Sequence, residues 1–303
     1  MSLGRLRNNS VPYSFLASRT SYDDARYIVV GVPYDATSSW IPGSRFGPLA
    51  IIEASRFMDP FDLELGCVPS EAGIHTVPEI SVMELTPEAM VGAVEGIVRE
   101  IRSDGKVPIL LGGEHTLTLG AVRALKEELD AVVILDAHAD FYDDYEGRKV
   151  CHATVSKRVS EMVNEVLIYG IRTIGWEEME ELNYARNVNV LYTEVSVEKA
   201  LQEIMKIIRG KKIYLSVDVD VLDPSQVPCI GTPEPGGLSY KEVLKLLKGI
   251  MKESEVQAMD FVEFSPCPGM RSDAFLVAKL IYKSIGYHAS YSGEHDLGCR
   301  PDE

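Results

Sequence analysis

The sequence predicts an α/β fold of three layers, in which helices cover both faces of a mostly parallel central sheet. Two features predict it. Short runs rich in β-branched residues are apolar almost throughout, as in strands that are buried on both faces. Amphipathic segments alternate with these runs, which favours parallel strands joined by helices. The predicted strands span residues 27–32, 107–111, 132–135, 166–170, 188–192, 212–217 and 256–261.

Two of the intervening helices have recognisable starts. Thr86 is a capping residue, and Pro87 and Glu88 follow it in the first turn. Ser239 and Glu242 form a capping box at the start of another helix. The first helix has one apolar face, so we expect that face to pack on the sheet. Its members are Met90, Val91, Val94, Ile97, Val98 and Ile101.

Length and composition favour one globular domain over residues 1–303, with an N-terminal arm at 1–20 and a polar tail at 290–303. No run of 18 apolar residues predicts a membrane span, and the first residues lack the order of a signal peptide. A net charge of −16 without a basic stripe argues against a nucleic-acid partner. We therefore expect a cytoplasmic protein that contacts neither membrane nor nucleic acid.

The cysteines are scattered, odd in number and without a CxxC pair. This pattern is typical of reduced thiols in a cytosolic protein and argues against a disulfide framework or a zinc finger. The five are Cys67, Cys151, Cys229, Cys267 and Cys299.

The clearest chemical motif follows the predicted strand 132–135. Asp136, His138 and Asp140 alternate there, so in an extended chain their side chains project to the same side. Ligands of parallel sheets gather beyond the carboxyl ends of the strands. Two carboxylates and an imidazole at such an end need a compensating cation, and a divalent metal supplies it.

Two further strand ends carry similar residues. Asp218 and Asp220 follow the run 212–217, and His115 follows 107–111 behind a pair of glycines that permits close backbone approach. Taken singly, His115 could be structural or a phosphate contact, and the aspartate pair could be a turn or a helix cap. Together the three ends offer four carboxylates and two imidazoles, which suits two ions. Oxygen-rich donors without thiolate favour manganese, with zinc, iron and cobalt as alternatives.

These motifs resemble those of the ureohydrolases, the arginase and agmatinase superfamily. Further signatures are residues 42–48 (Pro-Gly-Ser-Arg-Phe-Gly-Pro), 231–233 (Gly-Thr-Pro) with a following glycine pair, and 260–263 (Asp-Phe-Val-Glu). The resemblance covers most of the chain and implies an arginase-like fold, two manganese ions and a homo-trimer or homo-hexamer. By resemblance, one ion takes His115, Asp136, Asp140 and Asp218, and the other takes Asp136, His138, Asp218 and Asp220.

The resemblance also implies roles for residues outside the metal set. His152, twelve residues after Asp140, becomes the proton shuttle to the leaving amine, a task that suits a near-neutral pKa. Asp140 would orient the nucleophile. Glu263 grips the guanidinium group of the substrate, whose planar fork matches a carboxylate. Thr232 helps to line the pocket. Cys151 beside His152 could suggest a thiol nucleophile, but sequence neighbours rarely align as nucleophile and base.

The loop after Asp140 bears on the choice of substrate. Arginases recognise the carboxylate of their substrate through two residues. Tyr142 and Arg148 stand at the corresponding positions in this sequence. Between them, Asp143 and Asp144 make the loop acidic, which would repel a carboxylate and attract an ammonium group. The resulting prediction is a small cationic guanidino substrate, first agmatine, which would give putrescine and urea. The alternative substrates are N1-aminopropylagmatine, arginine and guanidinobutyrate. Alternatively, Asp143 and Asp144 only form a solvated surface turn.

Two other classes of function are open. Single-zinc amide hydrolases of the deacetylase type share the fold and an Asp-x-His motif, but His115 and Asp220 would complete a second metal site that they do not need. A non-enzymatic metal-binding subunit is the other alternative, although all six expected donor positions are filled.

Overall fold

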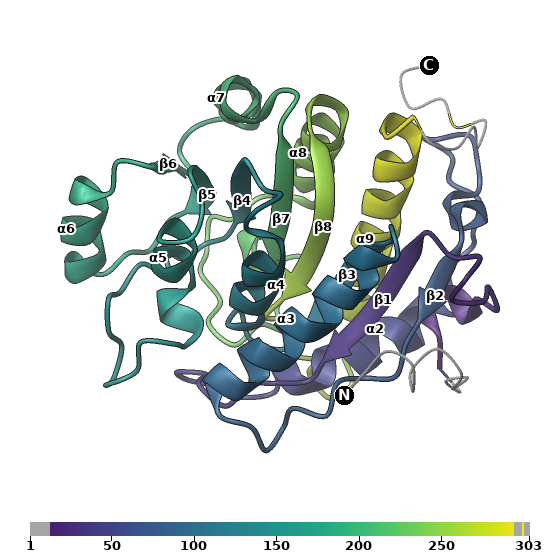
Figure 1. The fold of residues 1–303 in the computed structure, drawn as a ribbon, viewed down its shortest axis with the longest axis horizontal. Coiled ribbons are helices and arrows are strands. Elements are labelled where there is room, and N and C mark those ends of the chain that lie inside the picture. The colour runs from purple at the N-terminus through teal and green to yellow at the C-terminus, as the bar shows by residue number, and fades with distance from the viewer. Residues whose placement is uncertain (1–12, 294–298, 300–303) are drawn as a thin grey trace.

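The computed structural model describes residues 13–293 and 299 (Figure 1). The strands form one sheet of eight, with every pair parallel and the order β2-β1-β3-β8-β7-β4-β5-β6. The predicted mostly parallel sheet is therefore confirmed. The strands are β1 (Tyr27–Val32), β2 (Ile74–Thr76), β3 (Val107–Gly112), β4 (Ala131–Leu135), β5 (Val166–Ile171), β6 (Val188–Tyr192), β7 (Lys212–Asp218) and β8 (Glu255–Val262).

Helices cover both faces of the sheet. Successive residues of β1 alternate between two cores: Tyr27 and Val29 face one, and Ile28 and Val30 face the other. The first core includes α2, α7, α8 and α9, and the second includes α3, α4 and α5. In Figure 1, α3 and α4 lie in front of the strands. The helices are α2 (Gly47–Ser55), α3 (Pro87–Ser103), α4 (Leu117–Leu125), α5 (Val155–Ser160), α6 (Trp176–Tyr184), α7 (Val197–Ile208), α8 (Tyr240–Glu253) and α9 (Ser272–Tyr291).

The seven predicted strands are present, each within one residue of its predicted ends. Two details differ. The three-residue β2 was not predicted, because a run this short has no readable period. β6 is not buried on both faces as predicted, since it is an edge strand and its residues are half-buried or exposed.

Both predicted helix starts are confirmed. The Thr86 hydroxyl accepts a hydrogen bond from the Ala89 N–H at 3.3 Å, ahead of Pro87. Ser239 accepts from the Glu242 N–H, and the Glu242 carboxylate accepts in return from the Ser239 N–H at 2.8 Å. The predicted apolar face of α3 is buried.

The ends of the chain differ in part from the expected arm and tail. Within the predicted arm, Phe15 is buried and its N–H donates to the Thr76 hydroxyl at 2.9 Å. At the other end, α9 continues through Ser290 to Tyr291, so those two residues are helical. The rest of the predicted arm (1–12) and tail (294–298 and 300–303) lies outside the described residues. No helix within 13–293 is long and apolar enough to cross a membrane.

The prediction of five reduced cysteines is wrong for four of them. Cys67 is bonded to Cys299, and Cys229 to Cys267, with Cα–Cα distances of 5.0 and 5.5 Å. The partners are 232 and 38 residues apart, so only the fold brings them together. Cys151 is free and buried.

Candidate metal centre and its cavity

Four strands that are adjacent in the sheet, β3, β8, β7 and β4, end at one place. His115 lies just beyond β3, Asp136 directly follows β4, Asp218 ends β7 and Glu263 directly follows β8. Since all four strands run in the same direction, their carboxyl ends share one edge of the sheet. The structure therefore brings together residues that are up to 148 positions apart in the sequence, as His115 and Glu263 are.

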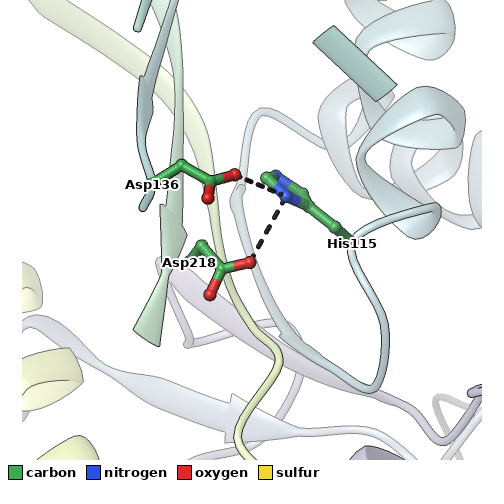
Figure 2. Close-up of side chains that lie close together, drawn as sticks. All are labelled: His115, Asp136 and Asp218. Atoms are coloured by element: carbon green, nitrogen blue, oxygen red, sulfur yellow. Dashed lines mark ion pairs between the residues drawn. The ribbon is translucent and has the colours of Figure 1, made fainter. Parts of the chain in front are cut away.

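The donors form two groups that share one aspartate. His115, Asp136 and Asp218 make the first, and Asp136, His138 and Asp220 make the second; within each, the potential ligand atoms lie within 4.8 Å of one another. Figure 2 shows the first group, with both carboxylates directed at the imidazole. Asp140 adds a carboxylate oxygen 3.2 Å from His115 Nδ1. All six predicted donors thus meet at one site, in an arrangement suited to two ions that share Asp136.

Two buried atoms at the centre test whether a metal fits. His115 Nδ1 and Asp136 Oδ2 are 3.1 Å apart, yet neither has a hydrogen-bond partner of acceptable geometry among the described residues. A buried polar atom without a partner costs free energy unless something else compensates it. Imidazole nitrogen and carboxylate oxygen are both ligands for manganese or zinc, so a cation between them would satisfy both.

The carboxyl groups show the same need for positive charge. Burial raises the pKa of Asp140 to about 7, and the charge of Asp136 adds to the rise. Burial and the charges of Asp220 and Asp136 raise the pKa of Asp218 well above its ordinary value. Several carboxylates can be ionised together here only if a cation compensates them.

The two histidines respond in the opposite sense. Burial opposes their protonation, but the neighbouring carboxylates outweigh it. Asp220 and Asp136 raise the pKa of His138 to about 12, and the nearby carboxylates of Asp136 and Asp140 raise the pKa of His115 well above its ordinary value. The field at this site therefore strongly favours positive charge, as a divalent cation would supply.

A second layer of hydrogen bonds holds His115 from behind. Its Nε2 lies 2.9 Å from the Ser216 hydroxyl, which donates to Asp260 at 2.6 Å. Asp260 is fully buried and also accepts from the hydroxyls of Thr118 and Tyr214. Such partners orient an imidazole so that its other nitrogen faces the metal. Asp260 belongs to the family signature at residues 260–263, but nothing in the sequence indicates its contact with Ser216.

The local backbone explains how these side chains reach the site. Asp140 and Glu263 have φ values of 49° and 64°, a left-handed conformation that is uncommon outside glycine and that persists where the surroundings enforce it. At Gly113, a Cβ atom would overlap the carbonyl oxygen of Tyr34. The close approach predicted for the glycine pair before His115 is therefore confirmed.

The donors open into a cavity of about 240 Å³ at this edge of the sheet. His115 and Asp136 are fully buried and are not among its lining residues. The predicted site residues that line it are His138, Asp140, Tyr142, His152, Asp218, Asp220, Thr232 and Glu263.

His152 lies at the wall of this cavity, with Nδ1 3.1 Å from the Thr37 hydroxyl and Nε2 2.8 Å from the Ser39 hydroxyl. Burial, together with the positive charges of His138 and His115, lowers the pKa of His152 to about 4, below the near-neutral value expected for a shuttle. A protonated His152 would therefore be a stronger acid than an ordinary imidazolium. Cys151 is buried against Thr154 and does not line the cavity, which removes the basis for a thiol nucleophile.

The acidic loop divides into two parts. Tyr142 lines the main cavity, but Asp143 and Asp144 line a neighbouring one of about 380 Å³. Asp143 forms ion pairs with Arg158 and Lys149, and Asp144 accepts from the Gly147 N–H at 2.8 Å. The structure therefore separates these two acids from the metal donors.

Several residues of the cavity wall were not predicted. Glu178, near the start of α6, is buried and accepts from the N–H groups of Phe141 and Gly175, and burial raises its pKa. Ser39, which lines the cavity, and Thr37, which is buried and does not line it, contact His152 from a loop more than 110 residues earlier in the chain. No motif marks them, and only the fold places them at the site.

Comparisons with known proteins agree with this geometry. Residues 25–286 match the model of the Arginase family. The N(1)-aminopropylagmatine ureohydrolase of Thermus thermophilus is 39% identical over 283 residues, which cover 90% of this chain and 94% of that protein. The agmatinase of Pyrococcus horikoshii is 35% identical over 88% of this chain and 93% of its own. The agmatine ureohydrolase structure of Thermoplasma volcanium has a TM-score of 0.86 at 34% identity, covering 95% of this chain and 98% of that one. The chain therefore belongs to the arginase family, whose ureohydrolases cleave C–N bonds of guanidino compounds.

Proposed function

We propose that this ureohydrolase converts agmatine and water to putrescine and urea. The composition of the cavity wall carries the proposal. Five carboxyl groups line the cavity, and neither lysine nor arginine is among the described lining residues. Bound metal would neutralise three of these groups, but the wall offers no cation to a carboxylate on the substrate tail, so it favours agmatine over arginine and guanidinobutyrate. The five are Asp140, Glu178, Asp218, Asp220 and Glu263.

Two manganese ions are the proposed cofactors. One would be held by His115, Asp136, Asp140 and Asp218, and the other by Asp136, His138, Asp218 and Asp220. The two donor groups that share Asp136 support this assignment. When bound, such a pair of cations generates a nucleophile from water near neutral pH and stabilises the charge that develops during hydrolysis.

The remaining roles belong to side chains of the cavity wall. Glu263 would bind the guanidinium group, because a carboxylate matches its planar pair of N–H donors. Asp140 would orient the attacking oxygen, and His152 would give a proton to the amine that leaves. Tyr142 and Thr232, which line the cavity, would contact the substrate tail. Asp143 and Asp144 lie outside this cavity, so they would act on the tail only from a distance.

N1-aminopropylagmatine is a second candidate, favoured by one further observation. The neighbouring cavity of about 380 Å³ shares Tyr142 and Tyr145 with the main one, and its other lining residues are all acidic. An aminopropyl extension would bring an additional ammonium group to this side. The relative from Thermus thermophilus that is 39% identical to this chain is named as an N(1)-aminopropylagmatine ureohydrolase. The acids of the second cavity are Asp143, Asp144, Glu146, Glu177, Glu180 and Glu181.

Steady-state kinetics with four substrates at saturating Mn²⁺ tests the assignment. Urea release from agmatine, aminopropylagmatine, arginine and guanidinobutyrate is compared as kcat/KM. The proposal expects the two cationic-tailed substrates to exceed the two carboxylates by at least about 100-fold, since an unpaired carboxylate in this acidic cavity would cost several kcal/mol. Preferred turnover of arginine or guanidinobutyrate would overturn it, and a preference for aminopropylagmatine would select the second candidate.

A further inference from the structure

A buried carboxylate outside the metal donors is connected to His152 through one hydroxyl group. Glu114 is fully buried. Its Oε1 accepts from the hydroxyls of Thr37 at 2.7 Å and Thr116 at 2.5 Å, and its Oε2 accepts from the Thr37 N–H at 2.7 Å. Three donors directed at one carboxyl group are the pattern of a carboxylate that only accepts.

The proton of the Thr37 hydroxyl is therefore committed to Glu114. A hydroxyl has one proton to donate, so towards all other groups the oxygen can only accept. Two nitrogens of His152 lie next to that oxygen: Nδ1 at 3.1 Å and the backbone N–H at 3.2 Å. For the first contact to be a hydrogen bond, Nδ1 must carry a proton.

The opposite ring nitrogen has a partner that can change its role. His152 Nε2 lies 2.8 Å from the Ser39 hydroxyl, which is also 3.3 Å from the hydroxyl of Tyr145. Ser39 can donate to Nε2 when that nitrogen is unprotonated. It can rotate its proton to Tyr145 and accept when Nε2 is protonated. His152, Ser39 and Tyr145 all line the main cavity.

We infer that Glu114 and Thr37 are positioning residues that hold His152 with Nδ1 protonated and Nε2 presented to the cavity, while Ser39 accommodates both protonation states of Nε2. This inference rests on the proposed function, in which His152 serves the leaving amine. His152 Nε2 takes up a proton that the attacking water releases. The Nε2–H bond of the resulting imidazolium then breaks as the proton joins the amine nitrogen, whose bond to the guanidino carbon breaks. His152 returns to the neutral form. Thr37 accepts from Nδ1–H before and after the transfer, so only Ser39 has to reorient.

The proton arrangement can be read by ¹⁵N NMR of the histidine rings in zinc-loaded protein, because Zn²⁺ is diamagnetic. The chain has six histidines, and the His152 signals are those lost in His152→Gln. The inference expects the wild type to have a proton on Nδ1 and none on Nε2. Thr37→Ser retains the hydroxyl and should keep that pattern, whereas Thr37→Val should give a mixture of tautomers. A wild type with the proton on Nε2 alone would overturn the inference.

Kinetics supply the second readout. Thr37→Val should lower kcat for agmatine about 10- to 100-fold, part of the usual contribution of acid–base catalysis, while KM and metal content stay near wild type. Thr37→Ser should recover most of kcat. An unchanged kcat in Thr37→Val would contradict the inference, as would a loss confined to KM.

Two further experimental outcomes need separate treatment. If Thr37→Val does not fold, Glu114→Gln replaces it, with the same expected loss of kcat at unchanged KM. If the wild type releases urea from no guanidino compound, the proposed function fails, while the NMR measurement still reports whether Nδ1 carries the proton.

Discussion

Asp136 is the residue on which the two donor groups depend, because it belongs to both. Its partners His115 and Asp218 come from β-strand ends on either side of it in the chain, so no local segment of the sequence contains a complete site. Each donor is expensive to bury alone, and the group becomes favourable only with a cation among its members. The same residues should therefore control metal content, activity and the stability of the metal-free protein.

Asp218→Asn tests this at a single residue. The change preserves shape but removes one charge, so we expect fewer than two manganese ions per chain. We also expect a loss of kcat greater than about 100-fold, since even the partners that orient metal ligands contribute roughly 10- to 100-fold. Metal analysis of the purified protein and urea release measure both.

The metal-free form of the same variant should behave differently. Burial and nearby carboxylates raise the pKa of Asp218, so its ionisation at pH 7 destabilises the folded state. Asp218→Asn removes that penalty, and we expect its Tm in chelator to equal or exceed that of the wild type. Glu203 is an exposed acid of α7 paired with Lys206, so Glu203→Gln is the matched control. It should change neither the metal content nor the Tm in chelator. Two bound ions and normal turnover in Asp218→Asn would refute the two-metal account.

At the level of whole elements, the sequence was most informative where burial is complete. Strands such as β1 and β3 are buried along their whole length, and their apolar runs gave their bounds within one residue. β2 is too short to show a period, and β6 is an edge strand whose apolar residues do not reveal that position. The clustering of the candidate metal donors could be predicted because each follows a readable strand. Thr37 could not, because its contact with Glu114 joins positions 77 residues apart in unrelated loops.

His288 couples one helix to the strands behind it, and it predicts a dependence of stability on pH. In α9, its Nε2 lies 2.9 Å from the Val256 carbonyl oxygen, which can only accept, and its Nδ1 lies 2.8 Å from the Tyr27 hydroxyl. The ring therefore donates from Nε2, accepts at Nδ1 and is neutral in the fold. Burial, and then the charge of Arg26, lower its pKa to about 4.

The sign follows from this lowered pKa. In the unfolded chain His288 protonates below about pH 6.5, but in the fold it resists until about pH 4. Stability is therefore lost as the pH falls from 6.5 towards 4, by roughly 3 kcal/mol in total from this group. Urea unfolding of the wild type and His288→Gln at pH 7 and pH 4.5 measures it. The variant should lose less stability between the two pH values, and an equal loss in both proteins would contradict this contribution of His288.

At the scale of the whole molecule, the two disulfides change the argument about compartment. A cytoplasmic location was predicted partly from cysteines that lack any paired pattern, and that support is gone. Disulfides persist in oxidising compartments, and also inside the cells of hyperthermophiles. The two bonds join distant parts of the chain. One fixes Cys299 to the region before β2, and the other joins Cys229, near Thr232, to Cys267, near Glu263.

Thiol counting tests both bonds directly. Protein unfolded in denaturant without reductant should show one reactive thiol per chain, Cys151, and five after reduction. Reduction should also lower the free energy of unfolding, because each bond restricts the unfolded chain by about 2 to 4 kcal/mol. The variants Cys299→Ser and Cys267→Ser separate the two contributions: each should expose one additional thiol, and the remaining disulfide should stay intact.

Since Cys229–Cys267 joins the segments that carry Thr232 and Glu263, we expect Cys267→Ser to raise KM for agmatine more than Cys299→Ser does. Five thiols without reductant would contradict the pairing and would restore the original support for a reducing compartment.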